Sequence, residues 1–119
     1  MALNKPEYTL WNNTRYALNG LAEIWSNEPS FRRQLLFFVV AGVIAWAWPG
    51  LSYVQHAVMF AVLFLPVMAE VANSAIERCV DLNTLEHHEL AKRAKDAGAA
   101  LVFLSFVVDG VVWLLVVTA

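Results

Sequence analysis

The stretch GAALVFLSFVVDGVVWLLVVTA, residues 98–119, decides the fold class of this chain. Its one charged residue is Asp109. Its length exceeds the roughly 20 residues that an apolar helix needs to cross the hydrocarbon core of a bilayer. The run therefore predicts a transmembrane segment, carried by a helix over about 85–118.

Two further apolar runs precede it. Residues 35–48 follow a pair of arginines and are stopped by a Pro-Gly pair. Residues 57–69 are interrupted by Pro66, which we expect to kink the helix rather than end it, because proline is tolerated inside membrane helices. We expect helices over about 30–48 and 53–81. The predicted fold class is an all-α membrane protein with three transmembrane helices.

The composition agrees with a membrane protein. Of the 119 residues, 60% are hydrophobic and 15% are charged, which is more apolar surface than one compact core can cover. We expect a single membrane domain over residues 1–119. The net charge of -2 and the scattered basic residues exclude nucleic-acid binding. A single cysteine, Cys79, excludes an internal disulfide and a cysteine-based zinc or redox site.

The basic residues are confined to the part of the chain before residue 34 and to residues 78–95. By the positive-inside rule both parts face the cytoplasm, and the C-terminus lies outside. Before the first span, apolar and polar residues alternate at helical spacing over about 6–27. This pattern favours an amphipathic helix on the cytoplasmic membrane surface; the alternative is a soluble cap packed on the bundle.

A polar stripe enters the membrane at the end of the second span. Glu70, Asn73, Glu77 and Asp81 advance by three, four and four residues, so they share one helix face. Ionisable residues inside a membrane usually mark a site or a relay, and the alternative for Glu70 is a structural partner for an arginine. Glu70 and Glu77 lie about 10 Å apart along the axis, too far to share one metal ion. We expect Glu70 to take a proton from a lipid hydroxyl and Glu77 to bind a divalent cation, unless Glu77 is simply an exposed carboxylate.

Further candidates flank this stripe. Lys95 and Asp96 offer a point charge for phosphate and a carboxylate for a metal or hydroxyl, or else a positive-inside anchor. Glu28 lies at the same interface as Glu77, and two such carboxylates can hold Mg²⁺ with bound phosphate; alone, Glu28 is a first-turn helix charge. No P-loop and no protein-kinase signature set occurs.

Two adjacent histidines, His87 and His88, are weak evidence for a metal. On a helix, neighbouring residues point about 100° apart, so the two rings diverge. We expect them to face solvent rather than to bind zinc.

These residues stand in a chain that resembles the small prokaryotic diacylglycerol kinase family over nearly its whole length. The resemblance rests on WSNEPSFRRQ (25–34), EVANSAIERCVD (70–81) and EHHELAKRAKDAGAA (86–100). It implies a homotrimer of three-span subunits in the bacterial inner membrane, with active sites shared between subunits at the cytoplasmic interface. It also implies transfer of the γ-phosphate of ATP, with Mg²⁺, to the primary hydroxyl of diacylglycerol, giving phosphatidic acid.

The resemblance also implies a role for each matching residue. Glu70 would be the general base, Asn73 would orient the catalytic group, and Glu28 and Glu77 would be the metal ligands that bridge to the phosphates of ATP. The nucleotide site would be formed by Tyr16, Glu28, Glu77, Glu86, His88, Lys95 and Asp96. The lipid substrate would contact Trp25, Phe31, Arg32, Trp48, Glu70, Ala99 and Trp113.

Two features depart from the family pattern. The surface helix has Thr9, Asn12 and Asn19 in a region where members often carry basic residues. Asp109 stands where an apolar residue is expected, facing the trimer axis or a polar group of a neighbour.

Two alternatives remain open. An undecaprenol kinase has the same fold and catalytic residues, although the context of Glu28 and Arg32 resembles the diacylglycerol branch more closely. A non-enzymatic transport or assembly subunit would use Glu70 and Asp109 for proton or ion passage.

Overall fold

The computed structural model describes residues 8–119, which contain helices and no strand. Residues 6 and 7 of the expected surface helix lie outside this part. The helices are α1 (Leu10–Asn27), α2 (Pro29–Ala47), α3 (Tyr53–Ala61), α4 (Phe64–Asn83) and α5 (Glu89–Val117). The predicted all-helical fold class is confirmed for the described residues.

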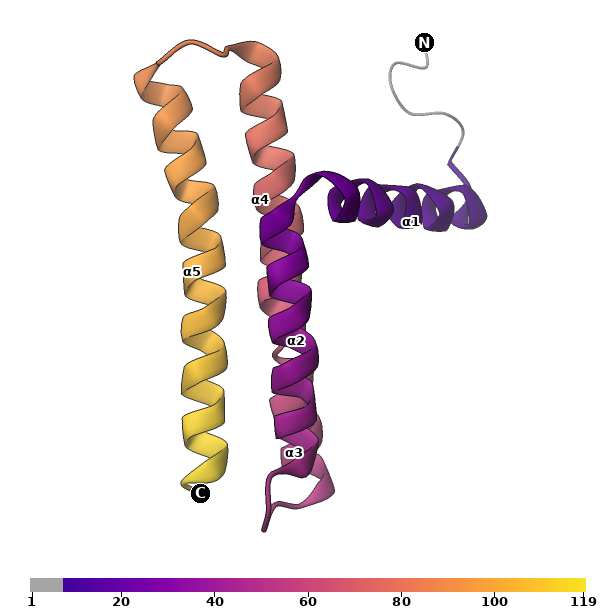
Figure 1. Ribbon diagram of the computed structural model, residues 1–119, viewed down its shortest axis with the longest axis vertical. Coiled ribbons are helices and arrows are strands. Elements are labelled where there is room, and N and C mark those ends of the chain that lie inside the picture. Colours follow the sequence, from indigo (N-terminus) through magenta and orange to yellow (C-terminus); the bar gives the residue numbers. More distant parts are fainter. Residues whose placement is uncertain (1–7) are drawn as a thin grey trace.

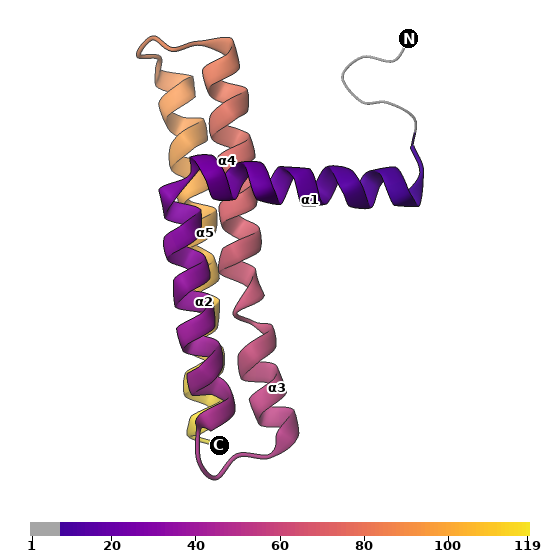
Figure 2. The ribbon, with the colours of Figure 1, turned by 45° about the vertical axis from the view of Figure 1, so that its right-hand side comes forward.

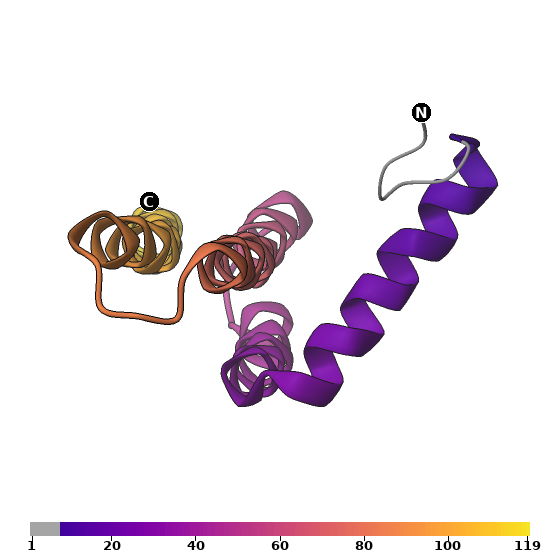
Figure 3. The same ribbon diagram turned by 90° about the horizontal axis from the view of Figure 1, so that it is seen from above.

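Three rods form a long bundle, and one helix leaves it. The rods are α2, α3 followed by α4, and α5, all running along the long axis (Figure 1). The most extensive contact between helices is that of α4 with α5. α1 runs across the bundle and projects away from it, as the turned view and the view from above both show (Figures 2 and 3). We call the end of the bundle with the α4–α5 connection the loop end, and the end with the C-terminus the far end.

Each rod is able to cross a membrane. Among the described residues, the segments Pro29–Ala47, Tyr53–Asn83 and Glu89–Val117 are long and apolar enough to span a bilayer, as predicted. Many of their large apolar side chains are exposed in the isolated chain, including Val39, Val43 and Leu114. A protein in water would not leave so much apolar surface uncovered, so lipid or further protein must cover it.

Local sequence explains where the helices begin. Thr9 caps α1 through its hydroxyl, which accepts a hydrogen bond from the Asn12 backbone N–H at 3.1 Å. Pro29 opens α2, where its fixed φ and missing N–H cost nothing. Ser52 and Gln55 form a capping box at α3. His88 caps α5 by accepting from the Leu90 N–H at 3.1 Å, so this histidine lies at a helix start and not within a helix.

The second span is interrupted before its proline. The sequence suggested one helix over 53–81 with a kink at Pro66, whereas the chain turns at Val62 and Leu63 between α3 and α4. The Leu63 N–H donates to the Phe60 carbonyl at 3.1 Å, three residues back. The Met59 carbonyl accepts instead from the indole N–H of Trp113 at 3.0 Å. A side chain of α5 therefore supplies a partner for the interrupted backbone.

Candidate active site

Glu70 is the best-defined polar group inside the bundle. Its side chain lies on α4 and is 6% exposed. Its Oε1 accepts a hydrogen bond from the Ser30 hydroxyl at 2.7 Å, and its Oε2 accepts from the Gln34 amide at 3.0 Å. Both donors lie one turn apart on α2, so the carboxylate is held between two helices by neutral groups. The sequence left open an arginine as a structural partner of Glu70. The donors to its carboxylate are instead the neutral side chains of Ser30 and Gln34 on α2.

Asn73 and Glu77 extend this polar face of α4 toward the loop end. Asn73 is 8% exposed, and its amide N–H donates to Glu77 Oε1 at 3.3 Å. The side-chain oxygen Oδ1 of Asn73 faces Gly98 on α5, at a distance that leaves no room for a Cβ there. The predicted sharing of one face by Glu70, Asn73 and Glu77 thus matches the structure, with Glu77 half-buried.

Arg78 ties α1 to α4. Its guanidinium forms ion pairs with Glu23 of α1 and with Glu28, the latter at 3.3 Å. These contacts bring Glu28 to α4 beside Arg78. Glu77 precedes Arg78 in the chain, and its side chain points about 100° away around the helix. Arg78 and Glu23 were not among the predicted site residues, and their spacing in the sequence gives no signal of the pairing.

A polar hollow lies at the loop end. It has a volume of about 290 Å³ and is formed by the end of α4, the connecting loop and the start of α5. Of the predicted nucleotide-site residues, it brings together Glu86, His88, Lys95 and Asp96. Opposite charges are already paired around it: Lys95 with Asp81 at 2.8 Å and Lys92 with Asp96 at 2.7 Å. Tyr16 lies on α1 and does not line this hollow.

The predicted lipid contacts fall into separate groups. Phe31 is 3% exposed, and the Arg32 guanidinium donates to the Trp25 carbonyl at 2.6 Å, so these residues meet where α1 joins α2, next to Ser30. Ala99 follows Gly98 on α5, and its side chain is exposed.

Trp48 and Trp113 are not brought to this site. Their rings stack edge to face with centroids 6.5 Å apart at the far end of the bundle. Along α2, Trp48 lies about 27 Å from Ser30. Within one chain, the structure therefore separates them from Glu70.

The described residues contain no group of three or more histidine, cysteine, aspartate or glutamate side chains that could hold a metal ion by themselves. Glu28 pairs with Arg78 of α4, whereas Glu77 is joined to Asn73. Mg²⁺ is commonly bound by one or two carboxylates together with substrate phosphates, so each of these two carboxylates is a ligand of the type that Mg²⁺ accepts.

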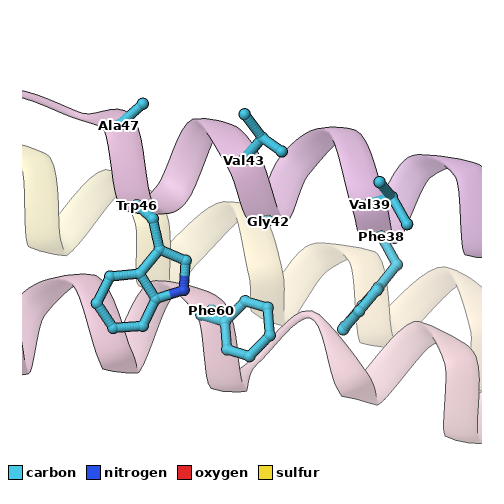
Figure 4. A pocket seen from close by; sticks show the side chains of 7 residues that line it. All are labelled: Phe38, Val39, Gly42, Val43, Trp46, Ala47 and Phe60. Carbon is cyan, nitrogen blue, oxygen red and sulfur yellow. The ribbon is translucent and has the colours of Figure 1, made fainter.

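A separate apolar groove lies between α2 and α3. Phe38, Trp46 and Phe60 line it, as Figure 4 shows, and its volume is about 520 Å³. Gly42 makes room for it, because a Cβ there would lie 3.3 Å from the Phe60 ring. Its lining residues carry no titratable side chain, so it offers no acid–base or metal chemistry.

Comparison with known proteins places this site in a family. A family model for prokaryotic diacylglycerol kinase matches residues 15–117, a range that contains every candidate site residue. The chain belongs to the prokaryotic diacylglycerol kinase family. It is 35% identical over 104 residues to a diacylglycerol kinase of Haemophilus influenzae, covering 87% of each chain.

Further diacylglycerol kinase relatives show the same likeness. The chain is 36% identical over 98 residues to that of Escherichia coli K12, with 82% of this chain and 80% of the relative covered. It is 39% identical over 102 residues to that of Pseudomonas aeruginosa, covering 86% and 82%. As a member of the diacylglycerol kinase family with three spanning segments, the protein is an integral membrane enzyme and a lipid kinase. A kinase family implies ATP as co-substrate.

Proposed function

We propose that this protein transfers the γ-phosphate of ATP to the primary hydroxyl of diacylglycerol, giving phosphatidic acid and ADP. The observation that carries the proposal is the Glu70 carboxylate, which is buried in the bundle and fixed by Ser30 and Gln34. It lies on the same helix that leads into the polar hollow with Lys95 and Asp96. The matching relatives, named diacylglycerol kinase, support the choice of acceptor.

Glu70 would act as the general base. The acceptor hydroxyl oxygen attacks the γ-phosphorus, the bond from this phosphorus to the bridging oxygen of ADP breaks, and the hydroxyl proton passes to the carboxylate. A carboxylate can accept about four hydrogen bonds, and those from Ser30 and Gln34 take two of these positions. Glu70 can therefore still receive the proton of the lipid hydroxyl. The two donors fix its orientation, which matters because phosphoryl transfer depends mainly on positioning.

Asn73 would be a positioning residue. Its amide donates to Glu77, and its carbonyl oxygen lies against Gly98. It would therefore fix the placement of the Glu77 carboxylate relative to α5.

The phosphates of ATP would lie over the hollow at the loop end. Lys95 is held there by Asp81 and would place its ammonium group near a phosphate. Glu28 and Glu77 would hold Mg²⁺, which, when bound, neutralises phosphate charge. Arg78 holds Glu28 in this structure.

The membrane arrangement belongs to the same proposal. The loop end, with its basic residues, would face the cytoplasm across the bacterial inner membrane, and α1 would lie on the membrane surface as an amphipathic helix. The protein would act as a homotrimer with shared active sites. Tyr16 does not line the hollow of its own chain, so a neighbouring subunit would supply it.

The experiment is transfer of radiolabelled γ-phosphate from MgATP to lipid by the purified protein in mixed micelles, with diacylglycerol and undecaprenol supplied together. Label in phosphatidic acid is the expected result. Label only in polyprenyl phosphate would move the activity to the undecaprenol kinases. Label in neither, by folded protein, would overturn the kinase proposal in favour of a transport or assembly subunit.

A further inference from the structure

Ser30 places a hydroxyl group directly on the Glu70 carboxylate. Its Oγ donates a hydrogen bond to Glu70 Oε1 at 2.7 Å. Ser30 is half-buried, whereas Glu70 is 6% exposed, so the hydroxyl lies nearer the surface than the carboxylate. By contrast, the hydroxyls of Thr14, Ser26 and Ser105 donate to main-chain carbonyl groups three or four residues back. A carboxylate can take up a proton from a hydroxyl group, and a main-chain carbonyl cannot serve as such a base.

The Ser30 side chain is chemically the same kind of acceptor as the lipid. It is a primary alcohol, like the hydroxyl of diacylglycerol that the proposed function phosphorylates. A lipid hydroxyl that gives its proton to Glu70 must come within hydrogen-bond distance of that carboxylate, where the Ser30 hydroxyl already lies. A γ-phosphate positioned for attack by the lipid hydroxyl would therefore also lie close to Ser30.

The position of Ser30 on α2 favours a phosphate there. Ser30 lies one turn closer to the loop end than Gln34, the other donor to Glu70, and the loop end holds the hollow with Lys95. It is the second residue of α2, after Pro29. Negative charge is favourable in the first turn of a helix, and Arg33 follows at a spacing that allows contact. A phosphoserine at this position would therefore be stabilised.

We propose that Ser30 is a second phosphate acceptor, and that without lipid the protein transfers the γ-phosphate of ATP to its own Ser30. The Ser30 oxygen bonds to the γ-phosphorus, the bond from this phosphorus to the bridging oxygen of ADP breaks, and the hydroxyl proton passes to Glu70. The products are phosphoserine and ADP. This inference rests on the proposed kinase function, because it uses the same base and the same nucleotide.

The test incubates the purified, delipidated protein in detergent with γ-labelled MgATP, with and without diacylglycerol, and counts label in protein and in lipid separately. Without lipid, we expect protein label that resists hydroxylamine and maps to Ser30 by mass spectrometry. With diacylglycerol, label should appear in the lipid and protein labelling should fall, because the two hydroxyls compete.

The other outcomes separate this inference from the kinase proposal. Label in lipid but none in protein would overturn the inference and leave the kinase proposal standing, whereas label in neither would overturn both. Label that hydroxylamine removes would be an acyl phosphate on a carboxylate. Label at Thr84, whose residue lines the hollow at the loop end, would mean a different acceptor. Either of these last two results would overturn the role of Ser30.

Substitutions give a second readout. Ser30→Ala should lose the protein label completely while still phosphorylating diacylglycerol, although more slowly. Gln34→Leu is the matched control, because it removes the other donor to Glu70 and keeps the Ser30 hydroxyl. Its protein labelling should slow by no more than its lipid transfer does, and Ser26→Ala should keep the label. Full labelling of Ser30→Ala would overturn the proposal. Should Ser30→Ala fail to fold, the mapped position of the label in the unaltered protein decides the question.

Discussion

Gly98 and Asn73 set the closest approach of α5 to α4. A Cβ at position 98 would collide with the side-chain oxygen Oδ1 of Asn73, and the side-chain amide N–H of Asn73 is itself joined to Glu77. A glycine on one helix thus allows the other helix to present its polar face at short range. The placement of the site depends on this contact.

Gly98→Ala should therefore destabilise the protein. The added methyl group collides with the end of the Asn73 side chain, so either that side chain leaves Glu77 or α5 moves, and overpacking of this kind costs about 1–3 kcal/mol. The measurement is the thermal unfolding midpoint in detergent. Gly110→Ala on the same helix is the matched control, because a Cβ there meets nothing within 4 Å. Equal midpoints for the two variants would contradict the close contact.

Loss of the donors to Glu70 should lower turnover. Ser30→Ala and Gln34→Leu each remove one hydrogen bond to the carboxylate, which then loses its fixed orientation. We expect kcat to fall by about tenfold for each, with a smaller change in the KM for ATP. Ser26→Ala is the control, because that hydroxyl bonds to the Ala22 carbonyl of its own helix. A change in the KM for ATP alone would argue against this role.

Arg78→Ala should loosen the attachment of α1 to α4 and change the global stability of the protein little. The Arg78 and Glu23 side chains are 41% and 48% exposed, and such exposed ion pairs contribute about 0–1 kcal/mol. We expect faster amide hydrogen exchange in residues 10–27 and a nearly unchanged unfolding midpoint. Arg93→Ala removes an ion pair within α5 and should leave α1 unaffected. Unchanged exchange of α1 in Arg78→Ala would show that other contacts hold it.

Trp113→Phe should destabilise the interrupted second span. It removes the indole donor and leaves the buried Met59 carbonyl without that partner, at a cost of about 1–3 kcal/mol. Trp48→Phe, at the other ring of the same stacked pair, keeps an aromatic side chain and serves as control. The unfolding midpoint should fall for Trp113→Phe and change little for Trp48→Phe. The reverse order would mean that ring stacking, and not the hydrogen bond, matters here.

Patterns local in the sequence predicted much of this fold. The apolar runs predicted the spans, and the helical spacing of Glu70, Asn73 and Glu77 predicted their shared face. The interruption at Val62 and Leu63 was not predictable in the same way, because the Met59 carbonyl that it frees accepts a hydrogen bond from the Trp113 side chain about fifty residues later.

Contacts between distant segments account for the rest of the site. Ser30 meets Glu70, and Arg78 meets Glu23, across gaps that no period in the sequence describes. A polar side chain at the start of an apolar span was the one available signal for Ser30. Charge complementarity alone does not select Glu23 among the acidic residues.

The central claim is that Glu70 is the base for phosphoryl transfer to lipid. The most direct test is kcat with MgATP and diacylglycerol for Glu70→Gln, beside Glu89→Gln, whose parent carboxylate is 66% exposed and pairs with Arg93 within α5. The account predicts a loss on the order of 10²–10⁴-fold in kcat for Glu70→Gln, with ATP binding retained and Glu89→Gln close to the unaltered protein. Full turnover in a folded Glu70→Gln protein would contradict it.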